Sequence, residues 1–278
     1  MPSDIKSEAQ EIRIRNGLPL AVTVGGKTLY VLREGQTSYN RNGAYICSQN
    51  DIEETYSLIT NRSVYAHMDE LSQGFVRIAN GCRAGVCGNF SKDGVISEVS
   101  GINIRIAGEF IGCARSVFEE CSGGGILIAG PPGSGKTTIL RDLIRFFSNS
   151  GKRVSVIDPR GEISALYSGR PSFDLGSNTD TYITQDKSFG ITAALRTMFP
   201  NIIAFDEIGT SSELSGVSEG FNAGVDIITT AHIGSADEIK KRKTVRELLL
   251  SGAINNLFLL SGKIGEKPQK IDIKEVPL

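Results

Sequence analysis

Residues 130–137 read GPPGSGKT, which has the spacing G-x-x-x-x-G-K-[ST] of a phosphate-binding P-loop. Its glycines allow the backbone to curl around an anion, and a helix that follows directs its positive end at the same anion. We expect Lys136 to reach the β- and γ-phosphates of a nucleotide and the hydroxyl of Thr137 to ligate Mg²⁺, so the predicted ligands are ATP and Mg²⁺. The predicted nucleotide-binding residues are Gly130, Pro131, Pro132, Gly133, Ser134, Gly135, Lys136, Thr137 and Thr138.

A second group of candidate residues follows the apolar run 202–205 (IIAF), which has the composition of a buried strand. Asp206 and Glu207 come directly after it, as in a Walker B motif. We predict that Asp206 holds Mg²⁺ through its water shell and that Glu207 orients or deprotonates the attacking water. The alternative is two acids at an exposed strand end, and the P-loop earlier in the chain favours the catalytic interpretation.

Two more strand-like runs end in polar residues. The run 154–157 ends in Asp158 and leads to Glu162, where carboxylates could position a water or Mg²⁺ beside the γ-phosphate. A helix cap and a first-turn acid are the alternative roles of these two residues. The run 226–230 leads to His232, which could sense or stabilise the γ-phosphate, although a solitary histidine is often structural. We predict Glu162 and His232 as catalytic residues.

These residues require a scaffold that brings several strand ends together. From residue 126 onward, strand-like and helix-like patterns alternate. This alternation predicts an α/β fold, in which a parallel sheet carries helices on both faces and binds its ligand at the carboxyl ends of the strands. We assign this P-loop ATPase domain to residues 126–278. Its predicted elements lie at 126–129, 139–143, 153–158, 192–199, 202–206, 214–223 and 226–230.

The first part of the chain has a different pattern. Three alternating runs, separated by Asn-Gly and Gly-Gly pairs, indicate an antiparallel meander. We expect a smaller, strand-rich α+β domain over residues 1–110, and an interdomain hinge over 111–125, where periodicity is lost and glycines cluster. The predicted elements are strands at 11–15, 20–24, 28–32, 75–79, 82–90 and 103–107 and helices at 52–59 and 64–73, the first of them capped near Ser48.

The composition narrows the class of protein. A formal net charge of -1 and a pI near 6.2 argue against a protein that coats nucleic acid. No apolar run approaches the roughly 20 residues of a membrane span, and the polar N-terminus is unlike a signal peptide, so we expect a cytosolic protein. Five cysteines without a C-x-x-C pair and two histidines predict reduced thiols and no zinc site. The basic run 240–243 (KKRK) is interpreted as a solvated helix face.

With these elements in place, the chain resembles the stage III sporulation protein AA family of endospore-forming bacteria, which is related to the type II and type IV secretion ATPases of the RecA-like P-loop class. Six segments carry the resemblance in the family's order: EIRIRNGLPL (11–20), YAHMDELSQGFVRIANGCRAGVCG (65–88), GPPGSGKTTILRD (130–142), VIDPRGE (156–162), LRTMFPNIIAFDEIG (195–209) and NAGVDIITTAH (222–232). Gly209-Thr210 replaces the Arg-Asp pair of the secretion ATPases, and no four-cysteine insertion is present, which suits the sporulation family.

The resemblance implies how the protein acts. In secretion ATPases, a hexameric ring places nucleotide between one subunit's P-loop domain and the next subunit's N-terminal domain, which donates arginines. Arg83, Arg105 and Arg115 are the candidates here, and surface arginines are the alternative. The implied function is Mg²⁺-dependent ATP hydrolysis that drives a secretion-like assembly during endospore formation, at the engulfment-stage channel from mother cell to forespore. The implied partners are further subunits and membrane-associated sporulation proteins, met in the mother-cell cytoplasm beside the membrane that faces the forespore.

Two other functions stay open from the sequence. One is a DNA-directed RecA-like motor; near-neutral charge and the lack of a basic, aromatic-rich strand count against it, so no nucleic-acid partner is expected. The other is a structural switch that binds ATP with little turnover. Glu207 counts against the switch, because a residue that acts on water serves hydrolysis.

Overall fold

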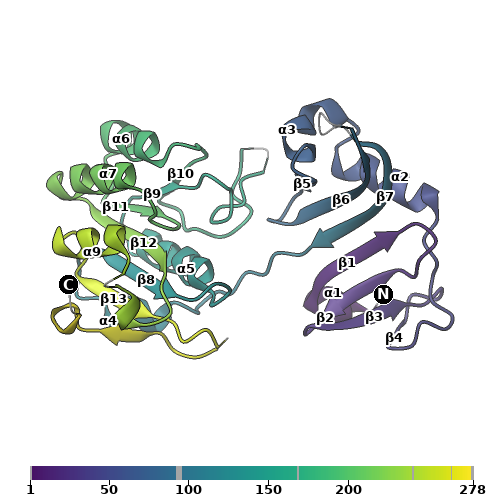
Figure 1. Ribbon diagram of the computed structural model, residues 1–278, viewed down its shortest axis with the longest axis horizontal. Helices are drawn as coiled ribbons and strands as arrows, with labels where there is room; N and C mark the ends of the chain where they lie inside the picture. Colours follow the sequence, from purple (N-terminus) through teal and green to yellow (C-terminus); the bar gives the residue numbers. More distant parts are fainter. Residues whose placement is uncertain (1, 92–95, 168, 240, 264, 277–278) are drawn as a thin grey trace. The chain divides into compact units, whose positions relative to one another are not determined.

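The computed structural model describes residues 2–91, 96–167, 169–239, 241–263 and 265–276 (Figure 1). The chain forms two compact units, which divide between Gly108 and Glu109. Each unit has its own sheet and its own hydrophobic core. Within the described residues, no helix is both long and apolar enough to cross a lipid bilayer.

The first unit is built on an antiparallel sheet. Its described elements are β1 (Ala9–Arg15), β2 (Ala21–Val24), β3 (Lys27–Val31), β4 (Thr37–Ser38), β5 (Phe75–Arg77), β6 (Arg83–Phe90), β7 (Ile96–Arg105), α1 (Ser3–Glu8), α2 (Gln49–Ile59), a 3₁₀ turn (Val64–His67) and α3 (Met68–Leu71). The strand order is β4-β3-β2-β1-β7-β6-β5. Ser48 and Asp51 cap α2 through reciprocal hydrogen bonds, and Ile52 and Ile59 of α2 join the buried cluster of this sheet. The predicted meander is present as β1, β2 and β3.

The second unit contains a mostly parallel sheet. Its described strands are β8 (Ile126–Gly130), β9 (Val154–Ile157), β10 (Thr179–Tyr182), β11 (Ile202–Phe205), β12 (Asp226–His232), β13 (Asn256–Leu259) and β14 (Gln269–Ile271). Its described helices are α4 (Arg115–Glu120), α5 (Lys136–Asn149), α6 (Lys187–Thr197), α7 (Ser211–Asn222), α8 (Ala236–Ile239), α9 (Lys243–Leu250) and a 3₁₀ turn (Ile273–Glu275). The order is β10-β9-β11-β12-β8-β13-β14, with β13 and β14 antiparallel. The predicted α/β fold is confirmed.

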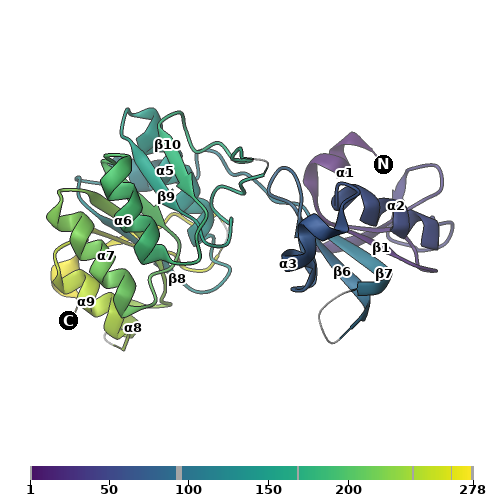
Figure 2. The same ribbon diagram turned by 90° about the horizontal axis from the view of Figure 1, so that it is seen from above.

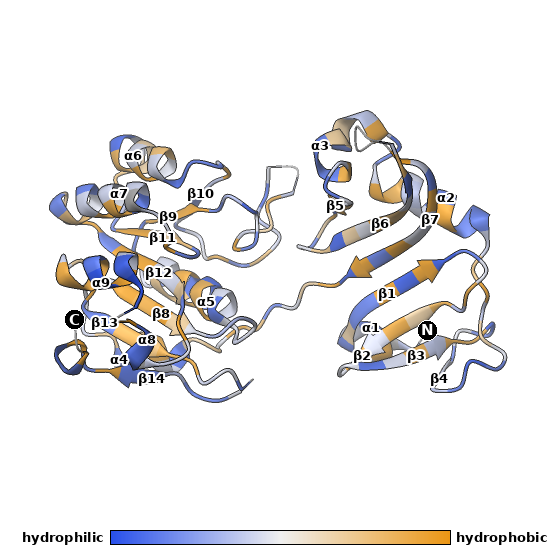
Figure 3. Ribbon diagram, in the orientation of Figure 1, coloured by the Kyte–Doolittle hydropathy of each residue, from blue (hydrophilic) through white to orange (hydrophobic). Residues whose placement is uncertain are grey.

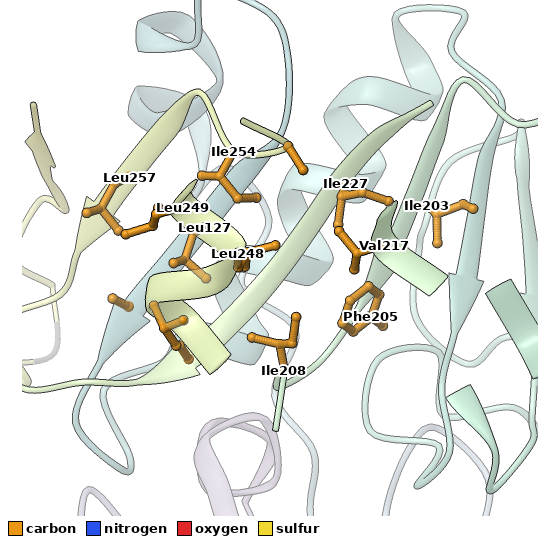
Figure 4. Close-up of a cluster of buried hydrophobic side chains, with 14 of the residues drawn as sticks. Leu127, Ile203, Phe205, Ile208, Val217, Ile227, Leu248, Leu249, Ile254 and Leu257 are labelled. Atoms are coloured by element: carbon orange, nitrogen blue, oxygen red, sulfur yellow. The ribbon is translucent and has the colours of Figure 1, made fainter. Parts of the chain in front are cut away.

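The central strands of this sheet are buried on both faces. Along β8, Leu127 and Ala129 belong to one cluster and Ile126 and Ile128 to the other, as the alternation of side chains along a strand requires. The helices α6, α7 and α9 cover the first face, whose side chains Figure 4 draws, and they lie together in Figure 2. The helices α4 and α5 cover the second face. Burial on both faces explains the unbroken apolar run of β8, which Figure 3 shows in hydrophobic colours.

The segment 111–125, predicted as an interdomain hinge, lies within the second unit. Its helix α4 packs on α5, where the ring of Phe118 stacks on that of Phe146 at a centroid distance of 5.2 Å. Asp142 of α5 accepts a hydrogen bond from the backbone N–H of Ala114 at 2.8 Å. The sequence pattern does not reveal α4 because six residues make fewer than two helical turns, so its apolar positions do not recur.

Candidate active site

The P-loop sequence connects β8 to α5. Gly133 and Gly135 have φ angles of 73° and 88°, in the left-handed region that favours glycine. At Gly130 an added Cβ atom would lie 2.5 Å from Oγ of Ser134 and 3.0 Å from Cβ of Leu260, so a larger residue here would displace side chains of the loop and of the segment after β13. The helix that begins at Lys136 is 14 residues long, and its first N–H groups face the loop. This arrangement suits a bound anion.

Lys136 is folded into this loop. Its Nζ donates hydrogen bonds to the carbonyl oxygens of Gly130 (3.0 Å) and Pro131 (2.8 Å), and it lies 3.1 Å from Nδ1 of His232. The residue is only 6% exposed, and this burial lowers the pKa of its ammonium group. An ammonium group only donates, so His232 meets a protonated Lys136 with the lone pair of Nδ1 and carries its own hydrogen on Nε2.

The other nitrogen of His232 faces Glu207. Its Nε2 lies 3.6 Å from Oε2 of that carboxylate, and the two side chains are 39% and 46% exposed. Lys136, His232 and Glu207 therefore form a line that runs from the P-loop to the end of β11. Water can reach the carboxylate at the far end of this line.

Asp206 joins three elements through hydroxyl groups. Its Oδ2 accepts a hydrogen bond from Oγ1 of Thr137 at 2.7 Å, and its Oδ1 accepts one from Oγ1 of Thr230. The same Thr230 oxygen accepts a hydrogen bond from the backbone N–H of Glu207 at 3.0 Å. Thr230 is thus a site residue that the sequence analysis did not single out. The available signal was a hydroxyl side chain two residues before His232, near the end of a predicted strand.

Asp158 directly follows β9 and is 2% exposed. Its Oδ1 accepts the N–H of Glu162 at 2.9 Å, and its Oδ2 accepts the N–H of Ile163 (3.2 Å) and both the N–H and the hydroxyl of Ser164 (2.8 Å each). Arg141 of α5 holds the same loop by donating to the carbonyl oxygens of Glu162 (2.8 Å) and Ile163 (2.9 Å). Asp158 therefore holds its own loop, and Glu162 is fixed through its backbone. The alternative of a helix cap and a first-turn acid is wrong, because residues 159–164 form turns and bends and not a helix.

A cavity of about 170 Å³ lies beside Glu207 and His232. The segment 241–245 also lines it, and the Thr244 hydroxyl of this segment donates to the carbonyl oxygen of Gly209 at 3.4 Å. The first residue of the basic run 240–243 lies outside the described residues, and the other three are exposed and line this cavity. Two of them precede α9, so the run is solvated as expected but only its last residue begins a helix.

The predicted arginines fall into two groups. Arg83 and Arg105 lie in the first unit and are direct partners in the β6–β7 ladder. Arg77 of β5 pairs with Arg83, so three arginines form a row across neighbouring strands, and paired residues share one face of a sheet. Arg115 instead lies on α4 of the second unit, with Nη1 3.9 Å from Oε1 of Glu119. The row of arginines therefore contains Arg83 and Arg105 but not Arg115.

Comparison with known proteins identifies the family. The profile described as "Sporulation stage III, protein AA" matches residues 3–273. "Stage III sporulation protein AA" of Bacillus subtilis (strain 168) is 30% identical over 266 residues, which cover 91% of this chain and 83% of that protein. The structure of the pilus retraction motor PilT with bound ADP has a TM-score of 0.65 at 17% identity, over 96% of this chain and 79% of that chain. For the Legionella pneumophila ATPase DotB the TM-score is 0.58 at 16% identity, over 96% and 77%.

PilT and DotB are too low in sequence identity to this chain to show more than a common fold. That fold extends over 96% of this chain in both comparisons. The family assignment has broader support, because the matched profile covers both units and the relative from Bacillus subtilis is similar over most of its own length. The chain belongs to the sporulation stage III protein AA family.

Proposed function

We propose that this protein hydrolyses ATP with Mg²⁺ during sporulation and works as the motor of a secretion-like assembly between mother cell and forespore. The observation that carries the proposal is a network of contacts between six residues at the carboxyl ends of β8, β11 and β12. Its members are Lys136, Thr137, Asp206, Glu207, Thr230 and His232. Family membership supports the role in sporulation, and the fold shared with an ATPase and a pilus retraction motor supports the role of a motor.

The residues at the end of β11 fit Mg²⁺ bound together with a nucleotide. In the part of the chain that the structure describes, no group of three or more His, Cys, Asp or Glu side chains gathers to hold a metal ion. Mg²⁺ at phosphate sites needs fewer, because one or two carboxylates, phosphate oxygens and waters complete its shell. Asp206 and the Thr137 hydroxyl, already 2.7 Å apart, are suitable ligands. Mg²⁺ there would neutralise charge on the β- and γ-phosphates.

Glu207 is the proposed base for the attacking water. Its N–H is fixed by Thr230, and its carboxylate is open to solvent. His232 contacts Lys136 through Nδ1 and faces Glu207 through Nε2. A γ-phosphate that draws the Lys136 ammonium away from Nδ1 therefore changes the contacts of a ring that also faces Glu207. This double contact supports His232 as the sensor of the γ-phosphate. Glu162, in the loop fixed by Asp158, is the second candidate for the base.

An arginine of the neighbouring subunit in a ring is proposed to act at the γ-phosphate. The ring would be hexameric by the family resemblance, and Arg83 and Arg105 would supply the charge. Arg105 is 73% exposed, so a phosphate can reach it, and the phosphate would replace Glu11, whose Oε1 lies 3.8 Å from Nε of Arg105. The P-loop unit offers a poorer choice in Arg196, which lies nine residues after Lys187 on α6, roughly 13 Å along the helix axis. Lys187, not Arg196, reaches the end of β11.

The partners and the place of action complete the proposal. Membrane-associated sporulation proteins would receive the motor's work at the mother-cell side of the membrane that faces the forespore. The chain's near-neutral charge supports a protein partner over nucleic acid. Arg160, which follows Asp158 at the same sheet edge, is the arginine to test if the site needs no neighbour.

ATP turnover by the full chain, measured against protein concentration with and without membranes that carry the partner proteins, tests the proposal. Because an arginine from a neighbour contributes about 10³ or more to the rate, turnover per subunit should rise as rings assemble. A mixture of the double variant Arg83→Ala, Arg105→Ala with Lys136→Ala should regain part of the activity, since some interfaces then combine an intact P-loop with intact arginines. High turnover at every concentration, with an inactive mixture, would contradict the shared site. Intact MgATP binding without turnover under any condition would favour the structural switch.

A further inference from the structure

The turn after β11 holds Glu207 on both sides of its backbone. Its N–H donates to Oγ1 of Thr230 at 3.0 Å, and its carbonyl oxygen accepts a hydrogen bond from Nζ of Lys187, the first residue of α6. The φ angle of Glu207 is 52°, in the left-handed region that residues other than glycine adopt only when their surroundings enforce it. The direction in which the Glu207 carboxylate projects therefore depends on these two contacts.

Lys187 is itself held by Glu213 of α7. Its Nζ lies 3.1 Å from Oε1 of Glu213, and the two side chains are only 16% and 12% exposed. The other oxygen of Glu213 accepts the N–H groups of Gly209 (2.7 Å) and Thr210 (3.1 Å), which complete the turn. The Lys187 ammonium also lies 5.8 Å from the centre of the Phe205 ring, at the start of the same segment. One mostly buried ion pair thus connects both ends of segment 205–210.

We propose that Lys187 is a positioning residue for Glu207 and that Glu213 anchors it. The inference rests on the proposed ATPase function, in which Glu207 acts on the attacking water. The turn residues Gly209 and Thr210 carry no charge, so the charges that fix the turn come from α6 and α7. Their partial burial strengthens the attraction between ammonium and carboxylate and limits competition by water.

Three roles of Lys187 have different kinetic consequences. If the ion pair only joins α6 to α7, its loss lowers stability but leaves kcat of the folded protein unchanged. If Lys187 binds phosphate directly, its loss raises KM. A positioning residue instead affects kcat with little change in KM, because Lys136 and Thr137 still bind the nucleotide.

The test compares Lys187→Met and Lys187→Arg with the wild type. We expect Lys187→Met to lower kcat about 10- to 100-fold, the effect of moving a reacting group by about 1 Å, while KM for MgATP stays within about twofold. Lys187→Arg keeps a charged donor and should restore part of kcat. Lys267→Met is the matched control: Lys267 also pairs with a glutamate, Glu120 at 2.7 Å, but its side chain is 65% exposed, so neither constant should change. Unchanged kcat in Lys187→Met, or a higher KM alone, overturns the proposal.

A second readout is independent of turnover. Hydrogen exchange at the amides of Gly209 and Thr210 should become faster in Lys187→Met, while the amides of β8 stay protected. If Lys187→Met does not fold, Glu213→Gln replaces it: the amide keeps an acceptor for these N–H groups but loses the charge, so kcat should fall by a smaller factor. If the amides of Gly209 and Thr210 exchange as slowly in Lys187→Met as in the wild type, the proposal is overturned. A folded wild type that hydrolyses no ATP under any condition contradicts the proposed function instead, and the exchange rates then still decide whether Lys187 holds the turn.

Discussion

Asp158 and Asp206 directly follow two neighbouring parallel strands, β9 and β11, each of which has four residues and is buried along its whole length. Asp158 accepts its hydrogen bonds from the backbone and a hydroxyl of its own loop, whereas Asp206 accepts from hydroxyl groups of two other elements. A backbone N–H can leave only if the loop unfolds, but a threonine hydroxyl can rotate away. Two acids with the same local sequence pattern therefore differ in whether their partners can be exchanged for a metal ion.

Asp158→Ala should have the largest effect, and it should be an effect on stability. The substitution leaves three backbone N–H groups and the Ser164 hydroxyl without their acceptor, and buried donors without partners cost about 1–3 kcal/mol each. Because the loop can partly relax, we expect the free energy of unfolding to fall by about 4 kcal/mol in total, measured by urea denaturation. Asp180→Ala, at an exposed position of β10, is the control and should change it by less than about 0.5 kcal/mol. A loss below 1 kcal/mol for Asp158→Ala would mean that this loop does not depend on its carboxylate.

Substitution of Asp206 or Glu207, the two acids after β11, should instead change nucleotide binding or turnover. Glu207→Gln is expected to keep MgATP bound and to lower turnover by about 100-fold or more, because a general base contributes about that much. Asp206→Asn should weaken the dependence of ATP binding on Mg²⁺, since it removes the charge beside Thr137. Steady-state turnover and ATP binding titrated with Mg²⁺ separate the two effects. Wild-type turnover in Glu207→Gln would transfer the role of base to Glu162.

MgATP should stabilise the wild type by about 2.7 kcal/mol when present at about 100 times its dissociation constant, because it binds only the folded chain. Lys136→Ala should abolish this shift, which thermal unfolding with and without MgATP measures. Asp158→Asn provides the contrast: its site lies outside the contacts of Lys136, so a variant that still folds should keep most of the shift. Equal melting temperatures of the wild type with and without MgATP would remove the basis for the nucleotide site.

Thr230→Val should have the smallest effect, about 1.5 kcal/mol in stability, with a decrease in kcat because the N–H of Glu207 loses its acceptor. The chain offers a matched control one residue earlier. Oγ1 of Thr229 is buried without a hydrogen-bond partner among the described residues, so Thr229→Val should be neutral or slightly stabilising and should leave kcat unchanged. If both variants behave alike, the hydroxyl of Thr230 does not link Asp206 to Glu207.

The features that the sequence predicts well are those fixed by neighbours along the chain. The apolar runs of β8 and β11 predict strands because both faces of a parallel sheet are buried. The glycine spacing predicts the loop because Gly133 and Gly135 need left-handed backbone angles. The acids Asp206 and Glu207 are placed correctly at the end of β11 for the same reason, since a strand that stops at Phe205 leaves them at its carboxyl end.

The features that the sequence does not reveal depend on contacts between distant segments. Thr230 meets Asp206 only because β11 and β12 are adjacent in the sheet, and Lys187 meets Glu207 only because α6 packs beside α7. The sequence also does not reveal that Arg141 of α5 donates to the carbonyl oxygen of Ile163, because that residue lies in the loop after β9. The strand β10 (TDTY) lacks an apolar run because it lies at the edge of the sheet, where one side chain in two need not be buried.

The hydrogen bonds that Lys136 makes within its own loop bear on which nucleotides the protein selects. Two carbonyl oxygens and an imidazole nitrogen already meet the three donors of that ammonium group. A nucleotide gains from the lysine only if it offers oxygens that replace these acceptors, so binding at this point is an exchange of partners. A monophosphate that does not extend to the lysine leaves these bonds as they are, whereas a triphosphate brings oxygens to the position where they can be exchanged. Under the proposed function, we therefore expect the resting loop to discriminate by the length of the phosphate chain.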